Sequence, residues 1–201
     1  MYNFNLTKEQ KDYLDNFCFI IAGKSGSGKT TISDKIEEMT KGQLKVLRSY
    51  TTRPPRFKDD KDHTYITEEE YNKLTNKIAT ACINNYHYCA TVEQYNESNI
   101  YVCDLEGIKS LGTLIQLVNC PMRKPIVIYL DVSKEERERR MRKQGRKEEE
   151  IQFRLKEDDN RFDEIEQYSD IIIKGDNTDW NEVIRNMADF IINQICEIDN
   201  E

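Results

Sequence analysis

Gly23-Lys-Ser-Gly-Ser-Gly-Lys29-Thr30 is the stretch of this sequence that decides its fold. It fits the pattern G-x-x-x-x-G-K-[ST], and it directly follows the apolar run Phe17-Cys-Phe-Ile-Ile-Ala22. Glycines let a backbone wrap around a phosphate without Cβ clashes, and the amides at a helix N-terminus then point at the anion. The sequence therefore predicts a buried strand, a phosphate-binding loop and a helix over residues 29–39.

This loop predicts a nucleoside triphosphate site, with ATP and Mg²⁺ as its ligands. Lys29 would reach the β- and γ-phosphates and act in catalysis, and Thr30 would give its hydroxyl to the metal. The predicted ATP-binding residues are Gly23, Lys24, Ser25, Gly26, Ser27, Gly28, Lys29 and Thr30. Switches, motors and kinases all use such loops, so the loop alone does not select a reaction.

The rest of the chain alternates between strand and helix patterns, which predicts an α/β fold with a parallel sheet of about five strands flanked by helices. Thr7-Lys-Glu-Gln10 predicts a capped helix over about 8–15, within an N-terminal extension of residues 1–16 that precedes one domain, 17–201. Further strands are expected at 44–47, 99–103, 125–132 and 170–173, and helices at 105–118, after Ser133, and at 179–198.

Residues 50–100 differ in character, because they are rich in Tyr, Asn, Asp and Thr. Thr67 opens a short helix that runs to about Leu74. Strands at 78–83 and 86–90, joined at Asn84-Asn85, read as a hairpin. We expect a small, partly antiparallel insertion in this region.

Composition excludes several classes of protein. Of 201 residues, 30 are Lys or Arg and 37 are Asp or Glu, so the net charge of −7 argues against nucleic acid as a partner. We expect no secretory signal and no membrane segment, because the N-terminus is polar and no apolar run is long enough to span a bilayer. The 6 cysteines form no C-x-x-C pair, which predicts buried free thiols in a reducing cytoplasm and no zinc site.

A second anion site is predicted in Ser49-Tyr-Thr-Thr-Arg53-Pro-Pro-Arg56. Two arginines three residues apart, on a segment stiffened by prolines, could clamp a phosphate. The alternative interpretation is an exposed proline turn with solvated charges.

In tandem, these two motifs resemble the guanylate kinase family. The resemblance continues through Tyr86-His-Tyr-Cys-Ala-Thr-Val92, through Asp104-Leu-Glu-Gly107, and through a basic region after Ser133. It implies a P-loop fold with residues 50–100 as an inserted subdomain that binds a nucleoside monophosphate (NMP), and a helical lid at about 137–156. It also implies that ATP phosphorylates a nucleoside monophosphate, GMP above all. A monomer and a homodimer are both compatible with the sequence.

The resemblance implies acceptor-binding roles for Ser49, Arg53, Arg56, Tyr88 and Asp104, and catalytic roles for Arg140 and Arg154 besides Lys29. The other lid arginines are predicted to be solvated, with helical ion pairs Glu135–Arg139 and Glu136–Arg140.

The sequence departs from the family where guanine is read. The family's glutamate falls in Ile78-Ala-Thr-Ala-Cys-Ile83, which holds no carboxylate, and its small hydroxyl residue falls at Ala90. Guanine presents N–H donors that need acceptors. Another phosphorylated acceptor, such as a different nucleotide or a ribose bisphosphate, is therefore an open alternative, and a non-catalytic binding module is a third.

Overall fold

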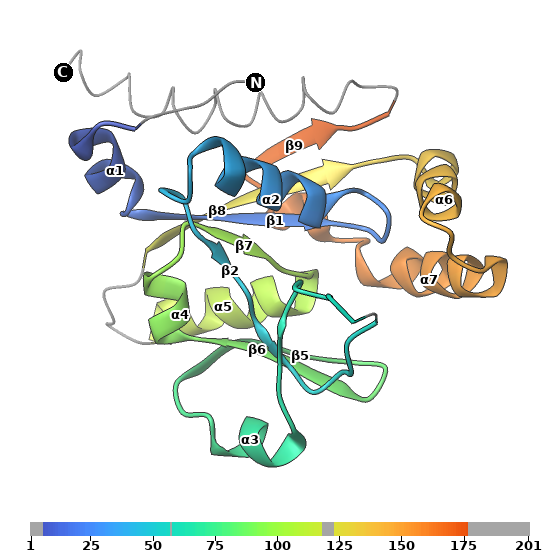
Figure 1. Cartoon of the computed structure of the whole chain (residues 1–201), viewed down its shortest axis with the longest axis horizontal. Coiled ribbons are helices and arrows are strands. Elements are labelled where there is room, and N and C mark those ends of the chain that lie inside the picture. The colour runs from blue at the N-terminus through green and yellow to red at the C-terminus, as the bar shows by residue number, and fades with distance from the viewer. Residues whose placement is uncertain (1–5, 57, 118–122, 177–201) are drawn as a thin grey trace.

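A computed structural model describes residues 6–56, 58–117 and 123–176 of the chain. Its centre is a five-stranded, fully parallel sheet with the strand order β2-β7-β1-β8-β9 (Figure 1). The strands are β1 (Phe17–Gly23), β2 (Val46–Leu47), β7 (Ile100–Val102), β8 (Lys124–Asp131) and β9 (Ile171–Lys174). The predicted α/β fold is confirmed.

The middle strand, β1, is buried on both faces and divides the core in two. Phe19 and Ile21 pack on one face with α1 (Lys8–Leu14) and α2 (Lys29–Met39). Cys18, Ile20 and Ala22 pack on the other face, where α5 (Leu105–Leu117) lies. Alternate residues of a strand point to opposite faces, so a continuous apolar run serves a sheet that is covered on both sides.

A second, separate sheet of four strands lies below α5 in Figure 1, in the order β4-β3-β6-β5. Its elements are β3 (Tyr50–Thr51), β4 (Thr64–Tyr65), α3 (Glu68–Lys73), β5 (Lys77–Ile83), β6 (Tyr86–Thr91) and α4 (Val92–Asn96). β6 pairs antiparallel with β3 and β5, whereas β3 and β4 are parallel. Asn84 and Asn85 both have positive φ, as a tight hairpin turn requires. The predicted insertion is thus confirmed as a small, mixed sheet.

After β8 the chain forms two helices and a short 3₁₀ segment before it returns to the sheet as β9. These elements are α6 (Lys134–Lys143), α7 (Glu148–Arg161) and η1 (Ile165–Tyr168). Ser133 caps α6 by accepting a hydrogen bond from the amide of Glu136, as the sequence predicts. In the part of the chain that the structure describes, no helix is both long and apolar enough to cross a membrane.

The predicted elements that the structure describes lie within one or two residues of their observed bounds, but one strand is half the expected length, and β3, β4, α4 and η1 are not among the predicted elements. The strand expected at 44–47 pairs only at Val46–Leu47, because the carbonyl of Lys45 accepts from both Asn99 and Ile100 and ends the ladder there. The helix α4 was not predicted, although Thr91 and Gln94 form a capping box at its start. The helix predicted at 179–198 lies outside the described residues.

Candidate active site

An open cleft of about 910 Å³ lies between the phosphate loop, the insertion and the two helices α6 and α7. Each of the three regions contributes polar or charged groups to its walls. They include Ser25, Gly28, Lys29 and Thr30 from the loop, Ser49, Arg56, Asp62 and His63 from the start of the insertion, Gln144 and Arg146 from the turn between α6 and α7, and Glu150 and Arg154 from α7. The cleft therefore brings together segments that are far apart in the sequence.

The loop has the backbone that its glycines predict. Gly26 and Gly28 have φ of 79° and 98°, which side chains rarely tolerate, and Gly28 is the N-cap of α2. At Gly23 an added Cβ would lie 2.5 Å from the Ser27 hydroxyl, so a side chain would push the loop open. Three of the predicted loop residues thus have glycine for a steric reason.

Lys29 begins α2 and folds back over its own loop. Its Nζ donates to the carbonyls of Gly23 at 2.6 Å and Lys24 at 3.2 Å. Burial, together with the positive charges of Arg56 and Arg137, lowers the pKa of Lys29 to about 8. An ammonium group held away from water and next to other cations is a strong attractor for phosphate oxygens.

The loop is also braced from the lid side by a buried ion pair. Arg137 on α6, 2% exposed, donates to Asp158 on α7 at 3.2 Å and to the carbonyl of Ser25. Asp158 accepts from the amide of Ser25 at 2.7 Å. The prediction that Arg137 is a solvated helix residue is therefore wrong, because its charge is paired inside the protein.

The remaining lid charges are closer to expectation. Arg140 pairs with Glu136 as predicted, whereas Arg139 also pairs with Glu136 instead of Glu135, because Glu136 points between the two guanidinium groups. Arg140 further donates to the carbonyls of Ser27 and Gly175, so it joins the loop to the sheet.

Arg154 lines the cleft and pairs with Glu150 at 2.9 Å. Burial, the charge of Arg53 and the charge of Arg154 lower the pKa of Arg56, which lies on the insertion side. Guanidinium groups from two walls therefore repel one another across an open space, an arrangement that an anion between them would relieve.

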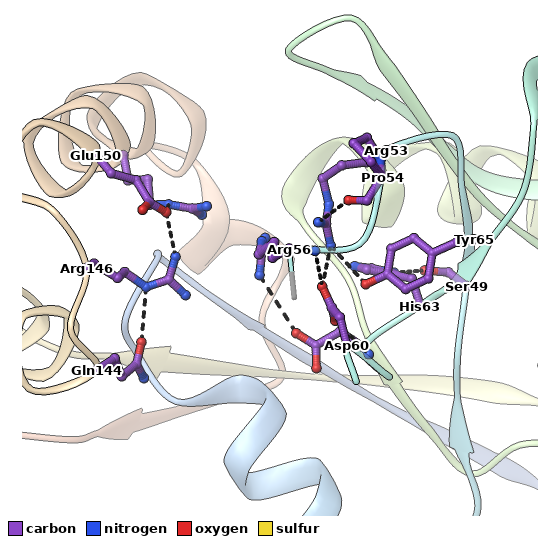
Figure 2. Close-up of polar contacts among 12 residues, drawn as sticks. Ser49, Arg53, Pro54, Arg56, Asp60, His63, Tyr65, Gln144, Arg146 and Glu150 are labelled. Atoms are coloured by element: carbon purple, nitrogen blue, oxygen red, sulfur yellow. Dashed lines mark hydrogen bonds and ion pairs between the residues drawn. The ribbon is translucent and has the colours of Figure 1, made fainter. Parts of the chain in front are cut away.

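The predicted clamp on the insertion side is organised by a carboxylate, as Figure 2 shows. Asp60 accepts from the amide of Arg56 at 3.0 Å and from Nη2 of Arg53 at 3.4 Å. Arg53 also donates to the Tyr65 hydroxyl and to the carbonyl of Pro54. Its Nε is buried and has no hydrogen-bond partner among the described residues.

Ser49 and His63 lie beside this clamp. The Ser49 hydroxyl and Nδ1 of His63 are 3.0 Å apart in a hydrogen bond, and the His63 ring packs edge-on against Tyr88 of β6. Burial and the charges of Arg53 and Arg56 lower the pKa of His63 to about 4, so the imidazole is neutral at pH 7.

Asp104 follows β7, as predicted, at the end of a central strand. It accepts from the amide of Gly107 at 3.0 Å and forms an ion pair with Arg161 at the end of α7. This carboxylate is therefore already partnered.

Thr30 fits the metal role that the sequence predicts. It lies in the cleft wall at the first turn of α2, next to Lys29. A threonine hydroxyl is a hard oxygen ligand, and Mg²⁺ is usually held by one or two protein oxygens together with substrate phosphates. Among residues 6–56, 58–117 and 123–176, no three His, Cys, Asp or Glu side chains gather into a metal site of their own.

Sequence reasoning missed two residues that shape this site, Asp60 and Asp158. Asp60 lies among the acids Asp59 and Asp62, and nothing in that local pattern shows which one is buried. Asp158 meets Ser25 across 133 positions of sequence, which no motif spacing encodes.

Comparison with known proteins gives a consistent result. The family model described as Guanylate kinase matches residues 16–194. A protein named "Guanylate kinase" from Caldanaerobacter subterraneus subsp. tengcongensis is 29% identical over 90% of this chain and 88% of its own length. One of the same name from Wolbachia pipientis wMel is 30% identical over 78% and 81%.

A shorter match is closer in sequence. The "Guanylate kinase" of Legionella pneumophila (strain Lens) is 37% identical over 84 residues, which is 39% of this chain and 40% of that protein. The chain thus matches well under half the length of that relative.

Proposed function

The chain belongs to the guanylate kinase family, and we propose that it transfers the γ-phosphoryl group of ATP to GMP, forming ADP and GDP. One observation carries the proposal. The phosphate loop around Lys29 and the guanidinium group of Arg56 line the same cleft, and the charge of Arg56 contributes to the lowered pKa of Lys29. Such a space would accept two phosphate groups facing one another.

In the proposed reaction the donor phosphates lie on the loop amides at the start of α2, with Lys29 on the β- and γ-phosphates. Arg53, Arg56 and Tyr88 hold the acceptor phosphate, with Ser49 beside them. Arg154 reaches from α7 into the same cleft, and Arg140 is proposed to act with it from α6. Each cation would offset negative charge as it moves between the two nucleotides.

No dedicated base is required in this scheme. The attacking group is a phosphate oxygen, which is already ionised near pH 7, so the rate would come from positioning and from charge neutralisation. We therefore assign no proton-transfer role to the neutral imidazole of His63. Helices α6 and α7 would act as a lid that excludes water from the cleft.

Mg²⁺ is proposed as the cofactor, held by the hydroxyl of Thr30 and by ATP itself. When bound, the ion neutralises phosphate charge. We also propose a cytoplasmic location, in a monomer or a homodimer, since the buried thiols Cys18, Cys89 and Cys103 suit a reducing compartment.

A second acceptor class is favoured by one specific observation. β5 carries no carboxylate, and both Ala79 and Ala90 of the β5–β6 hairpin are buried. The carboxylate of Asp104 is engaged by Arg161. The acceptor could then be a monophosphate or a ribose bisphosphate whose base, if present, is not read by an acid.

A coupled assay with MgATP separates these alternatives. The panel contains GMP, dGMP, AMP, UMP, CMP and ribose 1,5-bisphosphate at matched concentrations. Preferential turnover of GMP and dGMP supports the proposal, and preferential turnover of another acceptor replaces it with the second class. No turnover of any acceptor would mean a binding module, against which the intact sequence Gly28-Lys29-Thr30 argues.

A further inference from the structure

The acceptor side of the cleft depends on a carboxylate that does not itself line the cleft. Asp60 is buried, and its side chain has an exposed fraction of 0%. Oδ2 accepts from the Arg56 amide at 3.0 Å and from Arg53 Nη2 at 3.4 Å. Oδ1 accepts from the amide of Asp62 at 3.2 Å.

These contacts reach every part of the predicted clamp. The guanidinium group of Arg53 donates to both Asp60 and Tyr65, and the Tyr65 ring centroid lies 5.3 Å from its guanidinium carbon. The backbone amide of Arg56 donates to Asp60, and the Arg56 side chain lies in the cleft wall, where its Nη1 is 3.8 Å from Asp62.

The charge of Asp60 is stable in this setting. Burial opposes ionisation, but hydrogen bonds from the Tyr65 hydroxyl and from the amides of Arg56 and Asp62 lower the pKa of Asp60 below its usual value. A buried carboxylate with several donors and a guanidinium partner is costly to replace with a neutral group, because its donors would lose their acceptor.

We propose that Asp60 is the positioning residue of the acceptor site, which fixes Arg53 and Arg56 together so that they can bind one phosphate. This inference rests on the proposed function. Asp60 acts only through the two arginines, and it has no part in the loop that would bind ATP. The donor and acceptor sites should therefore respond differently to its removal.

The test compares Asp60→Asn with Asp59→Asn, a neighbouring exposed acid. The asparagine places an NH₂ donor against groups that are themselves donors, so the apparent KM for GMP should rise by about tenfold or more. The KM for ATP should stay within about twofold of the wild-type value, since the loop keeps its own contacts. Asp59→Asn should change neither constant.

Amide hydrogen exchange gives a readout that needs no turnover. In Asp60→Asn the amides of Arg56 and Asp62 should exchange faster, and those of Gly28 and Lys29 should not. Unchanged exchange at Arg56 and Asp62 would overturn the proposal. Equal rises in both KM values, with a general loss of stability, would also overturn it, because Asp60 would then support only the fold.

Failure of the proposed function is distinguishable from failure of this inference. If the wild-type chain turns over no acceptor, the proposed function fails. In that case, binding of inorganic phosphate is measured instead, from the change in the NMR chemical shift of the Arg56 amide. Phosphate should bind the wild type and bind Asp60→Asn about tenfold or more weakly, and equal binding would overturn the role of Asp60.

Discussion

The two walls of the cleft are built in different ways. The donor wall comes from one continuous backbone turn, Gly23–Thr30, of which Ser25, Gly26 and Gly28–Thr30 line the cleft. The acceptor wall includes the side chain of Arg56, and the buried carboxylate of Asp60 joins the Arg56 amide to the guanidinium group of Arg53. A phosphate site made of backbone amides requires only glycines and the start of a helix. A phosphate site made of arginine side chains requires further residues that hold those side chains in position.

Lys29→Ala should cause the largest change in activity. Loss of the ammonium group removes charge stabilisation of the moving phosphoryl group, so kcat should fall by about a thousandfold. The KM for GMP should change little, because the acceptor wall is untouched. The coupled assay measures both constants.

Lys35→Ala is the matched control for this variant, because Lys35 lies on the same helix and is exposed, with Glu38 as its ion-pair partner. It should behave as the wild type. A near-normal kcat in Lys29→Ala would contradict the proposed role of Lys29 in phosphoryl transfer.

Asp158→Ala should give the largest loss of stability. It leaves the charge of Arg137 buried without its partner and the amide of Ser25 without its acceptor. We expect the free energy of unfolding to fall by about 3 kcal/mol in urea titrations. Glu149→Ala, an exposed change on the same helix, should have little effect.

Replacing both partners tests the reason for that loss. An Arg137→Leu, Asp158→Leu double variant should recover part of the stability, because no buried charge is left unpaired. If Asp158→Ala lowered the free energy of unfolding by less than about 0.5 kcal/mol, the Arg137–Asp158 pair would contribute no more than an ordinary surface ion pair. Its assigned role in holding the phosphate loop would then be wrong.

These contacts show where sequence reasoning reaches its limit. The phosphate loop, α2 and β1 were predicted because their causes are local: glycines, a helix start and an apolar run. The pairing of Arg137 with Asp158 joins two helices by tertiary packing, so helical periodicity placed Arg137 among surface charges instead. The start of α4, by contrast, has a local cause, because Thr91 and Gln94 form a capping box.

The acceptor wall was predicted in part for the same reason. Arg53 and Arg56 were found from their spacing and the prolines between them. The choice of Asp60 over Asp59 as the buried acid depends on Tyr65 and on the loop's path through the insertion. That path is set by the pairing of β3 with β4, which involves only two residues of each strand and is weakly encoded.

Arg53→Ala should affect the acceptor far more than ATP. Removal of a partly buried guanidinium group should raise the KM for GMP by roughly thirtyfold to a hundredfold, with the KM for ATP nearly unchanged. Lys58→Ala provides a nearby exposed control. An unaltered KM for GMP in Arg53→Ala would contradict the assignment of Arg53 to the acceptor phosphate.

Acid pH should weaken the acceptor side through His63. Its pKa is about 4 in the folded chain against 6.5 for the free group, so the unfolded state binds the extra proton between these values. Stability from neutral His63 is thus complete above about pH 7 and is lost as the pH falls toward 4. Between pH 7 and 5 the wild type should lose about 2 kcal/mol more than His63→Gln.

Urea titrations of the wild type and of His63→Gln at pH 7 and pH 5 measure this difference. The contributions of the carboxylates cancel in the comparison, because both proteins contain the same carboxylates. Equal losses in the two chains would show that His63 is protonated as easily as in water, and the packing of its ring between Ser49 and Tyr88 would then need revision.

A crystal structure with a bisubstrate ligand, adenosine and guanosine joined through a chain of phosphates, would show where both phosphate groups bind. We expect the adenosine-side phosphates on the amides of Gly28–Thr30 with Lys29, and the guanosine-side phosphate against Arg53 and Arg56. A ligand whose phosphorus atoms lie away from either of these groups would contradict this expectation.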